Sequence, residues 1–332
     1  MVKETIFFKN KPRIIATSSI AGPKESSGPI ADFIEKKLDD DTFNEKTFEK
    51  AERKMFSYVI DKVIKNANLT YNDVNAIIAG DLLNQIISCS FASRDFPIPL
   101  IGVYSACSTM SESIALGATL VDGGYLDNVV CATGSHFSSA ERQYRYPLEL
   151  GSVRPPQAQW TVTGAGALML SKTGDYPAIT SATFGKVIDF GVKDTYNMGA
   201  AMAPACNDTL VTHFNNTNTL PNDYDLIITG DLGVLGSRII KDLAFKKGFD
   251  INKNHIDCGE IIFNIKEDEY QGGSGAGCSA VVLNSYIYKR LIEKKFNKIL
   301  FLATGALLST VTSMQGETIP CISHAVVIEN LT

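Results

Sequence analysis

An internal repeat is the feature of this sequence that most limits the folds open to it. Residues 73–82 (Asp-Val-Asn-Ala-Ile-Ile-Ala-Gly-Asp-Leu) recur 150 positions later as residues 223–232 (Asp-Tyr-Asp-Leu-Ile-Ile-Thr-Gly-Asp-Leu). In both copies an apolar run typical of a buried strand ends in Gly-Asp-Leu. Coincidence is the alternative interpretation, since strands ending in Gly-Asp are common in α/β proteins.

A second pair of segments favours duplication. Residues 130–134 (Val-Cys-Ala-Thr-Gly) resemble residues 302–305 (Leu-Ala-Thr-Gly), and each final glycine follows a cysteine, Cys107 or Cys278, by 27 positions. Two matches in the same order indicate two similar half-domains. A solenoid is not expected, because its repeats would be much shorter.

Helical and strand patterns alternate along the first half of the chain. Apolar residues recur at spacings of three and four over residues 45–68, which predicts a helix. Short apolar runs at 74–80, 98–104 and 128–133 predict strands, and helix signals follow the second run as far as Val121. Such alternation is typical of a mainly parallel sheet with helices on its faces.

The repeat and the alternation together predict an α/β protein made of two similar halves. We place the first half at residues 1–177 and the second at residues 178–332. We expect the two halves to stack as a five-layered α/β/α/β/α sandwich.

Composition and charge exclude several classes of protein. The chain is 45% hydrophobic and 20% charged, as in ordinary globular proteins, and its net charge of −5 offers no basic surface for nucleic acid. The longest apolar run, residues 299–308, is much shorter than the roughly 20 residues of a membrane-spanning helix. The N-terminus has no apolar core of signal-peptide length. If the protein works at a membrane, we expect partners to hold it there.

Two segments are rich in glycine and other turn residues. Residues 21–30 (Ala-Gly-Pro-Lys-Glu-Ser-Ser-Gly-Pro-Ile) predict a surface loop. Residues 272–278 (Gly-Gly-Ser-Gly-Ala-Gly-Cys) precede an expected helix and could hold an anion. They lack the Lys-Ser or Lys-Thr of a phosphate-binding loop, so close backbone packing is the simpler interpretation.

The cysteines single out one candidate nucleophile. The chain has seven cysteines and no Cys-x-x-Cys pair, so we expect reduced thiols and no structural zinc. Cys107 lies in residues 105–109 (Ser-Ala-Cys-Ser-Thr), between a buried strand and a helix start. The positive end of a helix favours the thiolate there. The alternative is a small cysteine packed under the helix.

Four further residues are candidates for binding a ligand. Asp81 follows a strand end, which in parallel sheets faces a crevice, although an aspartate there also caps helices. His136 and His324 lie beside strand ends, and each could equally be a structural histidine. Arg142, with Arg145, could bind carboxylates through paired hydrogen bonds, or could belong to a solvated charged loop.

The chain resembles a known superfamily and, more closely, one family within it. Duplicated halves and a cysteine at a strand-to-helix elbow resemble the thiolase fold. Seven longer motifs resemble the stage V sporulation protein AD family of spore-forming bacteria: residues 21–24, 79–85, 106–109, 120–124, 140–147, 225–232 and 303–309.

The resemblance implies a ligand-binding protein on a catalytic fold. The family is implicated in moving dipicolinic acid, with calcium, into the developing spore. Cys107 matches the superfamily's nucleophile position. Condensing enzymes, however, carry His-Gln-Ala-Asn where this chain has Thr-Gly-Asp-Leu at residues 229–232, and they carry Asn or His where it has Ser274. We therefore expect a protein that is not an enzyme, and keep a thiolase-like acyl transferase acting through Cys107 as the alternative.

The resemblance also implies a setting for this function. It implies peripheral attachment to the spore inner membrane beside other stage V sporulation A membrane proteins, and a possible homodimer. We expect no cofactor and no resident metal, since calcium would arrive with the ligand.

The sequence finally predicts where the ligand binds. Asp81, Cys107, His136 and His324 should meet in one cleft, with Arg142 as a further ligand-binding residue. The histidines would donate to the carboxylates of dipicolinate, and Asp81 would bind the calcium ion.

Overall fold

The computed structural model describes residues 4–144, 154–265 and 271–331. Its main sheet orders ten strands as β11-β10-β13-β14-β9-β2-β8-β6-β4-β5. In that order they are His255–Asp257, Leu226–Gly230, Lys298–Ala306, Cys321–Glu329, Ala178–Phe184, Arg13–Ala21, Gly164–Ser171, Asn128–Ser135, Ala76–Gly80 and Leu100–Gly102. Two short strands join this path, since β1 (Thr5–Phe7) pairs with β9 and β3 (Lys36–Lys37) with β2.

The strand order has the same pattern on both sides of its centre. β4 pairs in parallel with β5 and β6, and β10 pairs in parallel with β11 and β13. β8 is antiparallel to β6 and β2, and β14 is antiparallel to β13 and β9. The sheet is therefore mixed rather than mainly parallel. The difference arises because β8 and β14 run back antiparallel beside β6 and β13, the strands that come before them in the chain order of the main sheet.

The repeated segments occupy corresponding places in this pattern. Residues 73–82 contain β4 and residues 223–232 contain β10, the second strand from each end. The two inner strands β2 and β9 share a single residue pair, Arg13 opposite Ala178. The division of the chain at residue 177 stays a prediction.

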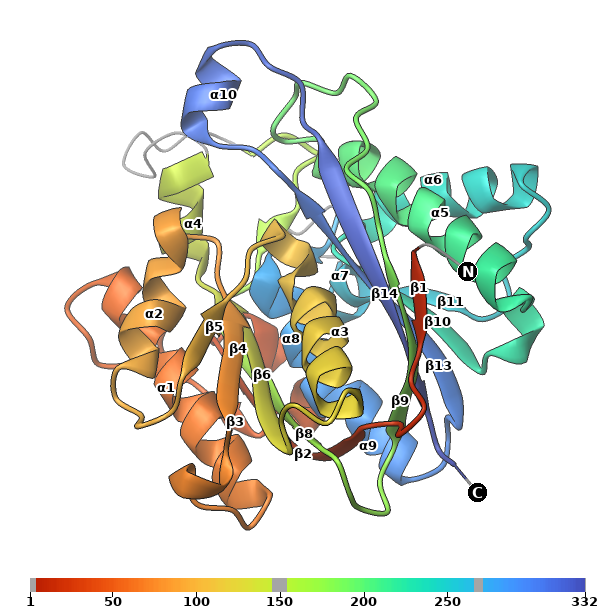
Figure 1. The fold of residues 1–332 in the computed structure, drawn as a ribbon. Helices are drawn as coiled ribbons and strands as arrows, with labels where there is room; N and C mark the ends of the chain where they lie inside the picture. Colours follow the sequence, from red (N-terminus) through yellow and green to blue (C-terminus); the bar gives the residue numbers. More distant parts are fainter. Residues whose placement is uncertain (1–3, 145–153, 266–270, 332) are drawn as a thin grey trace.

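Helices form three layers around the two sets of strands. The longer helices and those near the site are α1 (Phe48–Asn66), α2 (Ile87–Ser93), α3 (Thr109–Asp122), α4 (Phe137–Tyr144), α5 (Met198–Thr217), α6 (Gly233–Lys246), α7 (Cys258–Ile262), α8 (Ala276–Val282), α9 (Tyr288–Ile292) and α10 (Thr310–Met314). α3 and α8 lie between the two sets and contact strands of both, whereas α1 and α5 cover the outer faces (Figure 1). The five-layered α/β/α/β/α prediction is confirmed.

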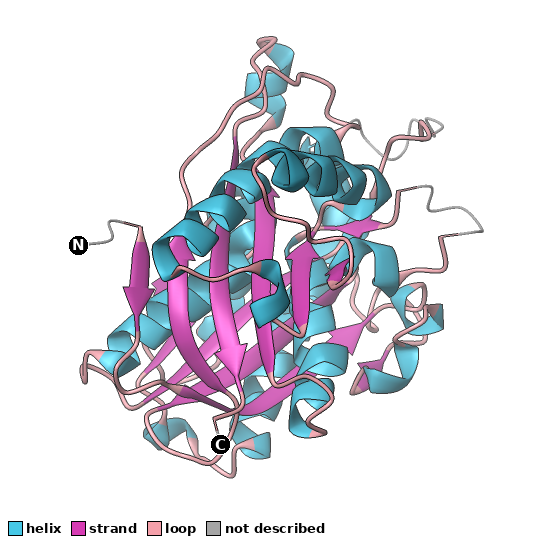
Figure 2. Ribbon diagram, turned by 90° about the vertical axis from the view of Figure 1, so that its right-hand side faces the viewer, coloured by secondary structure: helices cyan, strands magenta, loops and turns pink. Residues whose placement is uncertain are grey.

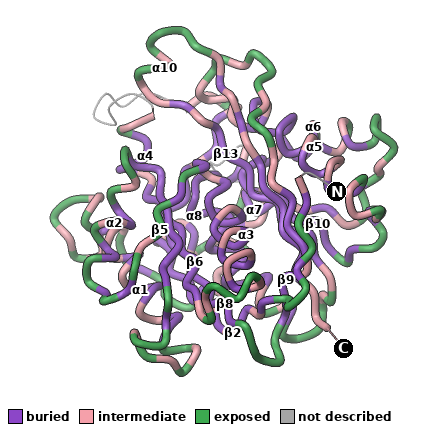
Figure 3. Tube along the Cα trace, in the orientation of Figure 1, coloured by how far each residue is buried: buried purple, intermediate pink, exposed green. Residues whose placement is uncertain are grey.

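Burial follows these layers. The strands and the central helices are buried, and α10 stands out as an exposed segment (Figure 3). Seen from the side, the strands run through the molecule between layers of helices (Figure 2). The apolar residues that predicted a helix over 45–68 line the inner face of α1, where Met55, Phe56, Val59 and Val63 are buried.

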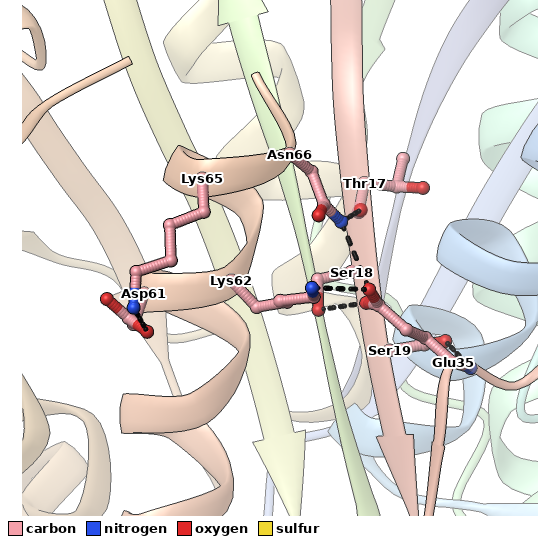
Figure 4. A network of polar contacts seen from close by, with 8 residues as sticks. All are labelled: Thr17, Ser18, Ser19, Glu35, Asp61, Lys62, Lys65 and Asn66. Carbon is pink, nitrogen blue, oxygen red and sulfur yellow. Dashed lines mark hydrogen bonds and ion pairs between the residues drawn. The ribbon is translucent and has the colours of Figure 1, made fainter. Parts of the chain in front are cut away.

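A polar network fastens α1 to β2 (Figure 4). Asn66, the last residue of α1, donates from Nδ2 to the Thr17 carbonyl oxygen at 2.9 Å and to Glu35 Oε1 at 3.2 Å. Ser18 Oγ donates to Glu35 Oε2 at 2.7 Å, and Lys62 Nζ lies 3.6 Å from Glu35 Oε1. Glu35 is therefore the common acceptor that joins the helix end to the strand.

The segment at residues 21–30 is not a simple surface loop. Glu25 is buried, with Oε1 accepting a hydrogen bond from the Thr163 N–H at 2.8 Å. Burial raises the pKa of Glu25 to about 7. Turn residues correctly predict the irregular backbone, but they do not show that one side chain turns inward.

Among the described residues, no helix is both long enough and apolar enough to cross a membrane.

Candidate functional site

Cys107 lies in a tight turn that leads into α3. The turn is one 3-10 segment, Ala106–Ser108, in which Ala106 has a left-handed φ of 52°. The Ser108 N–H donates to the Ser105 carbonyl oxygen at 3.0 Å and the Thr109 N–H donates to that of Ala106. These two N–H groups are therefore used by the turn itself. Cys107 is partly exposed, while the other six cysteines are buried.

The turn packs directly against β13 at Gly305. A Cβ atom at Gly305 would lie 2.1 Å from the Ser105 carbonyl oxygen and 3.0 Å from the Cys107 nitrogen. Only glycine allows this approach. The Thr-Gly of the second repeat pair thus brings the second half of the chain against the Cys107 turn.

Cys107 opens into a narrow pocket with a solvent-accessible volume of about 40 Å³, which we call the inner pocket. Both halves of the chain contribute to its walls. The lining residues are Leu82, Ala106, Cys107, Glu141, Tyr144, Thr161, Met198, Met202, Ser274, Gly275, Ala306 and Leu308.

The polar groups of the inner pocket come from three segments. A short parallel ladder pairs β7 (Trp160–Thr161) with β12 (Gly273–Ser274) and sets Thr161 beside Ser274. Thr161 Oγ1 donates to Glu141 Oε1 at 2.8 Å. Glu141 and Tyr144 lie three residues apart, so they share one face of α4. The described lining residues include no lysine, arginine or histidine.

Asp81 directly precedes Leu82, which lines the inner pocket, but Asp81 itself does not line it. Its side chain is fully buried, with Oδ1 accepting from the Leu83 N–H and Oδ2 from the Cys89 N–H, both at 2.8 Å. Burial raises the pKa of Asp81 to about 6. Asp81 therefore anchors the segment that follows β4. We expected its carboxylate to face a ligand, but both oxygens accept hydrogen bonds from the backbone.

His136 is also occupied inside the protein. Its Nε2 donates to the Asp41 carbonyl oxygen at 2.7 Å, and its Nδ1 accepts from the Ser138 N–H at 3.1 Å. Its ring stacks at a tilt on Phe48 with centroids 5.1 Å apart. Burial lowers the pKa of His136, and because Nε2 donates to Asp41 while Nδ1 accepts from Ser138, the ring has no donor left for a carboxylate.

His324 lies beside the Cys107 turn without lining the inner pocket. Its backbone N–H donates to Ser108 Oγ at 3.2 Å. Its Nδ1 accepts from the Gly185 N–H at 3.2 Å, and its ring meets Phe184 edge to face. Burial lowers the pKa of His324 to about 4.

Arg142 points to the opposite side of α4 from the inner pocket. It forms an ion pair with Glu49 of α1 at 2.7 Å and donates from Nε to the Ser138 carbonyl oxygen at 3.2 Å. Arg145 lies outside the described residues. Of the five predicted site residues, the structure thus brings Cys107 alone to the inner pocket, and the ligand-binding roles of the other four stay predictions.

Glu141, Thr161 and Tyr144 are pocket residues that the sequence analysis did not propose. Glu141 and Tyr144 lie close to Arg142 in sequence, but they are the residues of α4 that line the inner pocket. The pairing of β7 with β12 brings Thr161 beside Ser274, and no local sequence pattern predicts this pairing.

The fold and the cysteine elbow define a thiolase-like protein. The structure resembles 3-oxoacyl-[acyl-carrier-protein] synthase III from Aquifex aeolicus, with a TM-score of 0.56 and 14% identity over 96% of this chain and 99% of that one. It also resembles cerulenin-bound OleA from Xanthomonas campestris, with a TM-score of 0.62 and 12% identity over 97% and 98% of the two chains. At these identities the likeness concerns the fold.

Sequence comparison places the chain more narrowly. Residues 2–329 match the family model of stage V sporulation protein AD. The chain is 43% identical to stage V sporulation protein AD of Bacillus subtilis over 327 residues, which are 98% of this chain and 97% of that protein. The chain belongs to the stage V sporulation protein AD family.

Proposed function

We propose that the inner pocket binds dipicolinic acid or its calcium chelate, and that the protein takes part in moving this ligand into the developing spore. The observation that carries the proposal is a pocket that holds Cys107 but no histidine among its described lining residues. A shaped cavity with a few polar groups on its walls is sufficient for binding a small molecule. The choice of dipicolinic acid as the ligand rests on the family resemblance.

The lining favours the calcium chelate over the free dianion. Dipicolinate carries two carboxylates, and Glu141 brings a third carboxylate to the described lining. Calcium prefers carboxylate oxygens, so Glu141 replaces Asp81 as the proposed contact for calcium carried by the ligand. The hydroxyl of Ser274 supplies a donor for a ligand carboxylate, whereas the hydroxyl of Thr161 already donates to Glu141.

Calorimetric titration tests this proposal. Cys107→Ala should weaken binding several-fold through lost shape complementarity. Glu141→Gln should weaken the chelate at least tenfold while leaving free dipicolinate within about threefold. Glu317→Gln, an exposed carboxylate outside the pocket, is the matched control and should bind as wild type. Absence of binding with and without calcium, or wild-type affinity in both pocket variants, would overturn the proposal.

An acyl transferase acting through Cys107 is the second candidate. It is favoured by the partly exposed thiol on its left-handed turn. Incubation with an acyl-CoA followed by intact-mass measurement distinguishes the two functions. An acyl adduct that Cys107→Ser abolishes would support the transferase, and an unchanged mass would support the binding protein.

We further propose that the protein attaches peripherally to the spore inner membrane through other stage V sporulation A membrane proteins. The sequence motifs of the family support this assignment. Purified protein should then fail to sediment with neutral liposomes. Tight binding to such liposomes in the absence of any partner would contradict attachment through proteins.

A further inference from the structure

A second, larger cavity adjoins the inner pocket. This outer cavity has a solvent-accessible volume of about 490 Å³ and is formed by residues 82–86, residues 102–104, residues 307–309 and Thr312, together with Tyr144. It shares three wall residues with the inner pocket, namely Leu82, Tyr144 and Leu308. The two cavities are therefore separated by very few side chains.

Tyr144 is the polar member of this partition. Its hydroxyl donates to the carbonyl oxygen of Leu82, another shared wall residue, and lies 3.3 Å from the Tyr104 hydroxyl of the outer cavity. Leu82 itself is held in place, because the neighbouring Asp81 anchors the backbone of Leu83 and Cys89. The ring of Tyr144, at the end of α4, is the part of the partition that can turn about its side-chain bonds, with the loss of its hydrogen bonds to Leu82 and Tyr104.

The chemistry of the outer cavity selects a class of ligand. Two tyrosine rings and the side chains of Leu83, Val103 and Leu307 give it a mainly apolar surface, and Asn84 and Thr312 add uncharged polar groups. Within the described lining there is no charged side chain. A flat ligand without net charge needs no charged partner in such a cavity. A dianion would find no positive side chain in the described lining to balance its charge.

We propose that the outer cavity is a transit site for a flat ligand of zero net charge, such as an aromatic dicarboxylate paired with a divalent cation, and that Tyr144 gates its passage to Cys107. The identity of the ligand rests on the proposed function above, but the route does not. Turning the Tyr144 ring away from Leu82 joins the two cavities and opens the outer one to the thiol.

Alkylation of Cys107 tests the route without any ligand. Because the other six cysteines are buried, a bulky maleimide should label Cys107 selectively, and Cys107→Ser should abolish the labelling. Tyr144→Ala should speed labelling at least threefold. Asn84→Trp, which fills the outer cavity from a wall that the inner pocket does not share, should slow it at least threefold. Tyr125→Ala is the matched control, since it removes an exposed tyrosine that lines neither cavity and should leave the labelling rate unchanged.

The outcomes separate the gate from the proposed function. Unchanged labelling rates in both Tyr144→Ala and Asn84→Trp would overturn the gate, whatever binds. If the rates change as expected and dipicolinate still fails to bind, the gate stands and the proposed function falls. If Tyr144→Ala does not fold, the labelling rate of Asn84→Trp alone tests whether the route to Cys107 runs through the outer cavity. With calcium dipicolinate as the probe, stopped-flow association should slow in Asn84→Trp by the same factor as labelling.

Discussion

Several carboxyl groups of this protein are buried away from water. Glu25, Glu52, Asp81, Asp231 and Asp257 are each at most 1% exposed. Burial raises the pKa of every one of them, to about 7 for Glu25 and Asp257 and to about 6 for Asp81. Stability should therefore depend on pH near neutrality rather than only in acid.

Glu25→Gln should reveal this dependence. The pKa of Glu25 is raised from 4.5 to about 7 in the folded protein, so its contribution to stability is complete below about pH 4.5 and is lost as pH rises through 7. Glutamine keeps the acceptor for the Thr163 N–H and never ionises. Relative to wild type, the variant should gain on the order of 3 kcal/mol between pH 4.5 and pH 8, from ~1.36 kcal/mol per pKa unit. Urea unfolding at both pH values checks this, and a pH-independent difference would contradict it.

Gly305→Ala should disturb the Cys107 turn. The added Cβ would lie 2.1 Å from a backbone oxygen, so the strand or the turn must move. We expect a loss of about 2–4 kcal/mol, typical of severe overpacking, together with altered alkylation of Cys107. Gly316→Ala is the control, since its Cβ would meet nothing within 4 Å and only its φ of 75° opposes alanine. It should cost about 1 kcal/mol and leave Cys107 reactivity unchanged.

At the scale of elements, local sequence patterns correctly predicted the helix and the turn that are determined by interactions between residues close in sequence. The helix expected at 45–68 is α1, since apolar residues at helical spacing bury one face and Thr47 caps its start. The strand-to-helix turn identified Cys107 for the same reason. The directions of β8 and β14, and the meeting of Thr161 with Ser274, depend on contacts between distant segments. The sequence does not show which ring nitrogens of the histidines beside strand ends are already bonded within the protein, as both are in His136.

Asn66→Ala should weaken the attachment of α1 to β2. It removes two hydrogen bonds, to the Thr17 carbonyl oxygen and to Glu35. We expect a loss of about 1–2 kcal/mol in the free energy of unfolding. Lys65→Ala is the matched control one residue away, because it breaks an exposed pair with Asp61 worth at most about 0.5 kcal/mol. Equal losses in the two variants would show that the network of Figure 4 is not what holds the helix.

At the scale of the whole molecule, one end of the main sheet carries exposed apolar residues. β5 is the terminal strand, and Ile101 within it is 38% exposed. Ile87 and Phe91 of the adjacent α2 are 38% and 43% exposed. An open strand edge with apolar neighbours favours pairing with another chain.

We expect a homodimer formed through this edge. Sedimentation velocity should give a dimer for wild type and a monomer for Ile101→Asp, which places a charge on the terminal strand. Phe245→Asp, at an exposed position on α6, is the control and should remain dimeric. A wild-type monomer at tens of micromolar would refute the prediction.

The arrangement of the central helices also sets an order of events during synthesis. The strands β2, β4, β5, β6 and β8 are complete by residue 171, so they can pair while the ribosome is still making the rest of the chain. Their inner face stays partly open, because α8 packs there. Gly166 of β8 lies so close to α8 that a Cβ would come within 2.4 Å of the Ala280 oxygen. A nascent chain therefore carries an apolar sheet face that α3 covers in part until more than a hundred further residues have emerged, and exposed apolar surface of this kind makes a partly synthesised chain prone to aggregate.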